Sequence, residues 1–152
     1  MPEKEGFYFE DLSVGKVFET GYSAPITKKE VEIYCSLTGE TNPTHVYDKY
    51  SKQFGLKGLV VPGYLIPPVS AGLVKRDCPL EIIVIAESSA KFVKPIYLGD
   101  CIRVKNEVIA KEDMAGKPYG KVIIKREVYN RANELCAILT ADLRITKKAV
   151  KK

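Results

Sequence analysis

Apolar and polar residues alternate through the second half of the chain, and this period of two predicts β-strands. Between residues 101 and 110, Ile102, Val104 and Val108 fall on one side, and charged residues fall on the other. Strands are therefore expected over 81–93, 101–110 and 122–129, with a final strand after Glu134. The apolar face of that final strand consists of Leu135, Ala137, Leu139, Ala141, Leu143 and Ile145.

A helix is predicted ahead of these strands, beginning after Thr27. Thr27 and Glu30 have the spacing of a capping box, in which each side chain satisfies a backbone N–H at the helix start. Residues recur at helical spacing as far as Thr38, and Gly39 is a natural C-terminal stop. The helix should therefore end where the polar segment 39–45 begins.

Two more helices are predicted before the strands. A short one is expected from about Asp48, as the N-cap, to Gly55. Residues 58–76 are apolar on nearly every side, as expected of a helix buried by surrounding structure. Pro67-Pro68 complicate this pattern, because a proline beyond the first turn removes a hydrogen bond and kinks the helix. This helix therefore either bends at the prolines or begins later than residue 58.

Helices early in the chain and antiparallel strands late in it indicate an α+β fold class. The simplest arrangement is one buried helix against one curved antiparallel β-sheet. A chain of 152 residues fits one core, so we expect a single domain over residues 1–146. The basic run 147–152 is expected to be a frayed C-terminal tail.

Composition narrows the classes of function. Hydrophobic residues make up 45% and charged residues 28% of the chain, a globular balance, and part of the net charge of +5 comes from the tail. A short basic run has weak specificity, so no nucleic-acid partner is expected, and binding to nucleic acid or acidic lipid is the less favoured interpretation. Residues 58–74 lack charge but are too short and too often interrupted by proline and glycine to span a membrane.

The cysteines and the single histidine argue against a metal site. A zinc site needs about four ligands at characteristic spacings, and this chain has scattered cysteines and one histidine. We interpret the cysteines as reduced, buried thiols. The N-terminus has no apolar signal segment, so a cytoplasmic location is expected. The four cysteines are Cys35, Cys78, Cys101 and Cys136.

Candidate chemistry is concentrated in the segment that follows the first helix, where Glu40, Asn42 and His45 lie within six residues. Asn42 precedes Pro43, which forces an extended backbone, so the helix cannot resume and the chain must turn. The turn would bring a carboxyl group and an imidazole near one water molecule, and such a pair can transfer protons. The alternative is an ordinary solvated turn after a helix, because Asn-Pro is common in turns.

The residues around this segment resemble a known signature. Residues 34–45, which end in Asn42-Pro43-Thr44-His45, resemble the hydratase signature of MaoC-like dehydratases and (R)-specific enoyl-CoA hydratases. That signature reads aromatic, small residue, Gly, Asp, any residue, Asn, Pro, aliphatic residue, His. Residues 54–65 resemble the entry into the central helix of this family, and residues 92–100 resemble its strand junction.

The resemblance implies a single hotdog domain, in which a long central helix is wrapped by a curved antiparallel β-sheet, and a homodimer or a higher homo-oligomer of dimers. It implies hydration of trans-2-enoyl-CoA to (R)-3-hydroxyacyl-CoA, with the CoA thioester as substrate and no cofactor. Glu40 would protonate C2, and His45 would take a proton from water. Asn42 would orient this pair or a substrate group, and the Gly63 N–H would hold the thioester oxygen.

This sequence departs from the family pattern near both parts of the expected site. Glu40 stands where the signature has Asp, and Thr44 stands where it has an aliphatic residue. Pro62-Gly63 replace the usual His-Gly pair. Two other functions therefore stay open: a hotdog module that binds acyl-CoA without catalysis, and, less favoured, a hotdog thioesterase.

Overall fold

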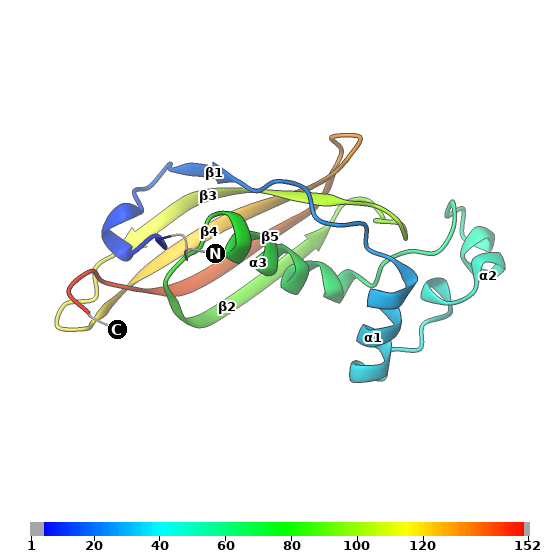
Figure 1. The fold of residues 1–152 in the computed structure, drawn as a ribbon, viewed down its shortest axis with the longest axis horizontal. Coiled ribbons are helices and arrows are strands. Elements are labelled where there is room, and N and C mark those ends of the chain that lie inside the picture. Colours follow the sequence, from blue (N-terminus) through cyan, green and yellow to red (C-terminus); the bar gives the residue numbers. More distant parts are fainter. Residues whose placement is uncertain (1–4, 151–152) are drawn as a thin grey trace.

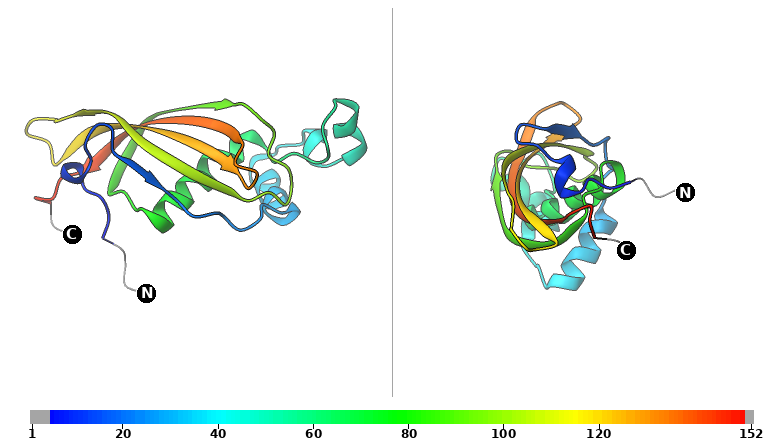
Figure 2. Two further views of the ribbon diagram at one scale, coloured as in Figure 1. Left: turned by 90° about the horizontal axis from the view of Figure 1, so that it is seen from above. Right: turned by 90° about the vertical axis from the view of Figure 1, so that its left-hand side faces the viewer.

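A single antiparallel sheet curves around one helix in the computed structural model, which describes residues 5–150 (Figure 1). The strands run in the order β1-β3-β4-β5-β2 across the sheet. Seen end-on, the sheet wraps α3 (Figure 2), so the α+β architecture expected from the sequence is confirmed. The strands are β1 (Val17–Glu19), β2 (Ile82–Phe92), β3 (Ile102–Glu112), β4 (Tyr119–Asn130) and β5 (Leu135–Thr146), and the helices are α1 (Lys28–Thr38), α2 (Asp48–Gln53) and α3 (Ile66–Asp77).

The alternation in sequence corresponds to the buried face of the sheet. Ile102, Val104 and Val108 of β3 have no exposed surface. Along β5 the residues at odd positions from Ala137 to Ile145 are buried, while Leu135 is half-buried. The prediction of these faces is confirmed. Strand β3 ends two residues beyond the predicted end at residue 110. Strand β4 begins three residues before the predicted start at residue 122 and ends one residue after the predicted end at residue 129.

The first helix begins and ends as predicted. The Thr27 backbone N–H donates to the Glu30 carboxylate at 2.8 Å, which is half of the capping box. Gly39 adopts the left-handed conformation with φ 74°, which glycine reaches without a steric penalty, and it ends α1. The short second helix is also confirmed, although its N-cap is Tyr47, and Asp48 lies in its first turn.

The helix predicted over 58–76 begins later in the structure. Val60 forms an isolated antiparallel bridge with Tyr97, and the Val61 N–H donates to the Ile96 carbonyl at 2.7 Å, so this segment is extended. A 3₁₀ turn, η3 (Gly63–Leu65), then leads into α3. Pro67-Pro68 therefore lie in the first turn of α3, where the missing N–H groups are not needed.

Strand β2 forms one edge of the sheet and is exposed along its whole length. All eleven of its residues are exposed, whereas buried and partly exposed residues alternate along most of β3, β4 and β5. Its apolar residues include Ile83, Val84 and Ile85, which are 49%, 49% and 57% exposed. An edge strand also offers unpaired backbone N–H and C=O groups, so β2 can accept a further strand.

The tail expected to be frayed begins with two residues that are bound to the domain. Lys147 forms an ion pair with Asp113 at 2.6 Å, and Lys148 forms one with Asp11. The last two residues of the chain, 151–152, lie outside the described residues. Among residues 5–150, no helix is long and apolar enough to cross a membrane. Within the same range, no group of three or more His, Cys, Asp or Glu residues is placed to hold a metal ion.

Candidate active site

The turn that carries His45 is fixed by Asn42. The turn is a short 3₁₀ helix, η2 (Pro43–His45), and Asn42 is its N-cap. The Oδ1 atom of Asn42 accepts hydrogen bonds from the Thr44 N–H at 3.1 Å and from the Thr44 hydroxyl at 3.0 Å. Asn42 therefore orders the backbone that leads into His45.

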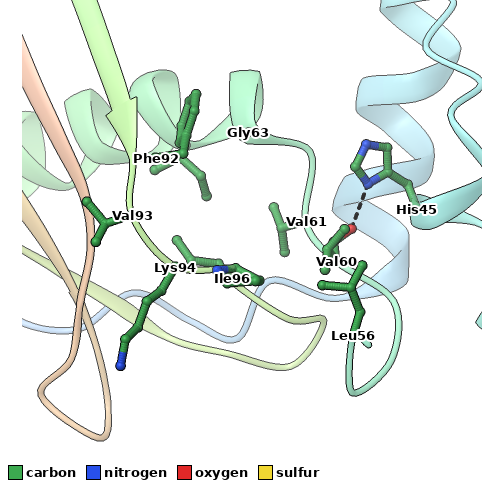
Figure 3. A pocket seen from close by; sticks show the side chains of 11 residues that line it. His45, Leu56, Val60, Val61, Gly63, Phe92, Val93, Lys94 and Ile96 are labelled. Carbon is green, nitrogen blue, oxygen red and sulfur yellow. Dashed lines mark hydrogen bonds between the residues drawn. The ribbon is translucent and has the colours of Figure 1, made fainter. Parts of the chain in front are cut away.

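The hydrogen bond of the His45 ring fixes which ring nitrogen is free. The Nδ1 atom lies 2.8 Å from the carbonyl oxygen of Val60 (Figure 3). A carbonyl oxygen can only accept, so Nδ1 must carry the hydrogen. In the neutral ring the lone pair is then on Nε2, and this atom can accept a proton.

His45 lines an apolar cavity of about 390 Å³. Figure 3 shows Phe92, Val93 and Ile96 around the same cavity as the His45 ring. Lys94 also borders it, and its ammonium forms an ion pair with Glu134 that raises the pKa of Lys94. The lining therefore combines one proton-transfer group with a largely apolar wall, which suits the hydrocarbon part of a ligand. The lining residues are His45, Leu56, Val60, Val61, Gly63, Ile66, Phe92, Val93, Lys94, Pro95 and Ile96.

Gly63 brings the start of a helical turn to this cavity. It is the first residue of η3, where a backbone N–H has no acceptor within the turn. A Cβ at this position would lie 3.2 Å from the ring of Phe92, so glycine allows the turn and the ring to approach without either having to shift. The structure therefore brings His45 and Gly63 to one cavity.

The structure does not bring Glu40 to the same cavity. Its Oε1 atom accepts the Asn42 N–H at 2.7 Å, and Glu40 is absent from the cavity lining. Burial raises the pKa of the Cys35 thiol, and the negative charge of the Glu40 carboxylate adds to that rise. Within the described part of the chain, no hydrogen bond or ion pair joins Glu40 to His45. Asn42 is likewise outside the lining.

Sequence reasoning missed two groups that hold His45. One is the Val60 carbonyl, which no side-chain pattern can reveal because it belongs to the backbone. The other is Ser51 of α2, which is fully buried and whose hydroxyl donates to the Thr44 carbonyl at 2.8 Å. Ser51 stands among other polar residues of α2, so nothing in the sequence indicates that its hydroxyl is buried.

The sheet wrapped around α3 is the hotdog fold. A Mycobacterium tuberculosis protein described as having a double hotdog fold superposes with a TM-score of 0.83 at 18% identity, over 97% of this chain and 46% of that one. Residues 10–130 match the family model of the MaoC-like domain. The chain therefore belongs to the MaoC-like dehydratase family.

Two relatives with similar sequences are named as enzymes. The chain is 24% identical over 95 residues to an (R)-specific enoyl-CoA hydratase of Rhodospirillum rubrum, covering 62% of this chain and 65% of that protein. It is 25% identical over 108 residues to a 3-hydroxybutyryl-CoA dehydratase of Methylorubrum extorquens, covering 71% of this chain and 68% of that protein. The chain thus spans about two thirds of the length of each relative.

Proposed function

We propose that this protein interconverts trans-2-enoyl-CoA and (R)-3-hydroxyacyl-CoA by adding or removing water. Membership of the MaoC-like family supports hydro-lyase chemistry in general. The observation that carries the proposal is the His45 ring, whose Nδ1–H is bound to Val60 while Nε2 is free to act as a base beside an apolar cavity. The thioester itself is the substrate, and the reaction as written needs no cofactor.

The proposed hydration step uses His45 and Gly63 together. The Nε2 atom of His45 takes a proton from water, and the water oxygen forms a bond to C3 of the enoyl group. The electron pair of the C2–C3 double bond moves toward the thioester carbonyl, where the Gly63 N–H stabilises the developing negative charge. Such charge is best stabilised by donors that are fixed before the reaction, which a glycine at the start of a helical turn provides.

Glu40, which must enter the step as the protonated carboxylic acid, completes it by delivering that proton to C2, while His45 gains one proton from water. In the structure the Glu40 Oε1 atom accepts the Asn42 N–H outside the cavity, so this role requires the side chain to rotate toward the substrate. The Glu side chain has one more rotatable bond than the Asp of the family signature, and this gives it the reach for such a movement. In dehydration, Glu40 removes the C2 proton and His45 protonates the leaving hydroxyl group.

We further propose that the protein forms a homodimer and that it is cytoplasmic. The exposed edge strand β2, with its apolar run 82–86, supports a homodimer in which the β2 strands of two copies pair. The free state of all four cysteines supports a cytoplasmic location, where thiols stay reduced.

Replacing Ile85 by lysine is expected to break the proposed dimer. Ile85 is a 57% exposed apolar residue of β2, and a charge there would be desolvated when two edge strands pair. Light scattering after size exclusion should give twice the chain mass for the wild type and one chain mass for I85K. Lys49→Asp on the exposed surface of α2 serves as the control and should leave the mass unchanged. A wild-type protein that is monomeric at micromolar concentration would contradict the pairing.

Replacing Gly63 by alanine is expected to lower kcat for hydration on the order of a hundredfold, comparable with the loss of an oxyanion donor. The added Cβ would lie 3.2 Å from the Phe92 ring, which is tighter than an ordinary contact, and we expect the turn to move in response and carry the backbone N–H away from its position at the cavity. Phe92→Ala removes that ring, and the double variant G63A/F92A should recover part of kcat. If G63A alone keeps full activity, the Gly63 N–H is not the oxyanion donor.

One observation favours a second function, a non-catalytic module that binds acyl-CoA. That observation is the position of Glu40 outside the cavity. Incubation with crotonyl-CoA separates the alternatives when both the enoyl absorbance and free thiol are followed. Loss of the enoyl absorbance without thiol supports the hydratase, whereas release of thiol supports a thioesterase. Binding of crotonyl-CoA with no change in either signal supports the module.

A further inference from the structure

A fully buried hydroxyl, that of Ser51, lies close to the turn that carries the proposed base. Ser51 has no exposed surface, although it belongs to α2, a helix of six residues whose other members are exposed. A buried hydroxyl must find a hydrogen-bond partner or lose the free energy of its hydration. Its oxygen lies 2.8 Å from the Thr44 carbonyl, to which it donates.

This hydrogen bond differs from the usual one for a serine in a helix. A helical serine commonly donates to the carbonyl four residues earlier, which here belongs to Tyr47. The Tyr47 carbonyl instead accepts the backbone N–H of Ser51 at 3.1 Å, and the Ser51 hydroxyl points out of the helix toward Thr44. The side chain therefore connects α2 to the turn η2, which carries His45.

Thr44 is the residue directly before His45, and its carbonyl accepts two hydrogen bonds. The shorter comes from the Ser51 hydroxyl at 2.8 Å, and the longer comes from the Val60 N–H at 3.3 Å. The Val60 carbonyl in turn accepts the hydrogen of His45 Nδ1 at 2.8 Å. Ser51, Thr44, Val60 and the ring of His45 thus form one connected set of hydrogen bonds.

We propose that Ser51 is a positioning residue, which holds the Thr44 peptide and thereby keeps the His45 ring against Val60 with Nε2 directed to the cavity. Ser51 is not among the residues that line the cavity, so it acts through the backbone of Thr44 and not on the substrate. This inference rests on the proposed function for its consequence in catalysis. Its structural part concerns the state of the His45 ring and stands without any substrate.

The test compares Ser51→Ala with Ser51→Thr, and with Lys52→Ala as the matched control. Alanine favours helix, so S51A and K52A should both keep α2 while only S51A removes the hydroxyl. Lys52 is an exposed neighbour, paired with Asp48. In S51A we expect kcat for crotonyl-CoA hydration to fall about tenfold, because displacement of a catalytic group by about 1 Å costs on the order of a hundredfold and Val60 still holds the peptide. KM should change little, S51T should recover most of kcat, and K52A should match the wild type.

The state of the ring is read separately by ¹⁵N NMR of the protein labelled at histidine. His45 is the only histidine in the sequence, so its two ring nitrogens give the only imidazole signals. With the ring neutral, the wild type should show hydrogen on Nδ1, and S51A should show a measurable fraction with hydrogen on Nε2. K52A should give the wild-type spectrum.

The outcomes separate this inference from the proposed function. If the wild type does not hydrate crotonyl-CoA, the proposed function fails, and the NMR comparison alone decides the role of Ser51. If the wild type is active and S51A keeps both its kcat and its ring signals, Ser51 does not position His45. A variant S51A that melts at a lower temperature but has wild-type ring signals also overturns the inference, because the hydroxyl would then only stabilise α2.

Discussion

Replacing His45 by alanine is expected to lower kcat for crotonyl-CoA hydration about a thousandfold, within the usual range for the loss of a general base. The reason is the free Nε2 atom, which no other side chain on the cavity wall can replace. Lys94 is the other titratable group there, and its ion pair with Glu134 keeps it protonated and unable to accept a proton. Steady-state kinetics of the purified variant would give this value.

A second variant, His45→Asn, separates the loss of the base from damage to the turn. The Asn side-chain amide can still donate to the Val60 carbonyl, as Nδ1–H does in the wild type, but it has no basic nitrogen. H45N should therefore be as inactive as H45A and melt closer to the wild-type temperature. Activity of either variant within tenfold of the wild type would remove His45 from the mechanism.

Replacing Glu40 by glutamine is expected to lower kcat on the order of a hundredfold or more, because an amide cannot deliver the proton to C2. The substitution isolates that function, since the Gln carbonyl oxygen can still accept the Asn42 N–H that the Glu40 carboxylate accepts. The loop should thus keep its conformation. The melting temperature of E40Q should stay near that of the wild type while kcat falls.

The companion variant Glu40→Asp tests whether the longer side chain matters. A shorter Asp can also accept the N–H two residues later, as aspartates do in turns. We expect E40D to lower kcat on the order of a hundredfold, because the lost methylene removes about 1 Å of the reach that Glu40 needs to enter the cavity. Full activity of E40Q would instead show that the proton reaches C2 from another group.

The features predicted well from sequence were those set by local patterns. The buried face of β5 follows from strict alternation, and α1 follows from the capping box at Thr27 and the stop at Gly39. His45 and Gly63 were expected in one site through the family resemblance, and the structure places both on one cavity. The hydrogen bonds of Asn42 follow the ordinary behaviour of an N-cap.

Features that depend on distant partners could not be predicted in the same way. Asn106 and Arg126 occupy inward positions of β3 and β4, where the alternation predicts apolar residues, and they are buried as a hydrogen-bonded pair. Burial lowers the pKa of Arg126, and nothing in its local sequence indicates this environment. The apolar run of β2 predicted a strand, but only the sheet order shows that it forms an edge.

The start of α3 and the position of Glu40 illustrate the same limit. Residues 58–62 are apolar like the helix that follows, but pairing with the segment around Tyr97 holds them extended. The spacing of Glu40 and His45 allowed both to reach one water molecule, yet the carboxylate instead accepts the nearby Asn42 N–H. In each case a hydrogen bond that sequence periodicity does not encode decided between two conformations.

The most direct test of the central claim is the product formed by the wild-type protein from crotonyl-CoA. The proposed chemistry predicts that the enoyl absorbance falls, that no free thiol appears, and that chiral analysis identifies (R)-3-hydroxybutyryl-CoA in an amount equal to the enoyl thioester lost. It also predicts the same equilibrium mixture when the reaction starts from the hydroxy thioester. An unchanged enoyl absorbance with crotonyl-CoA demonstrably bound, or release of thiol without hydration, would contradict the claim.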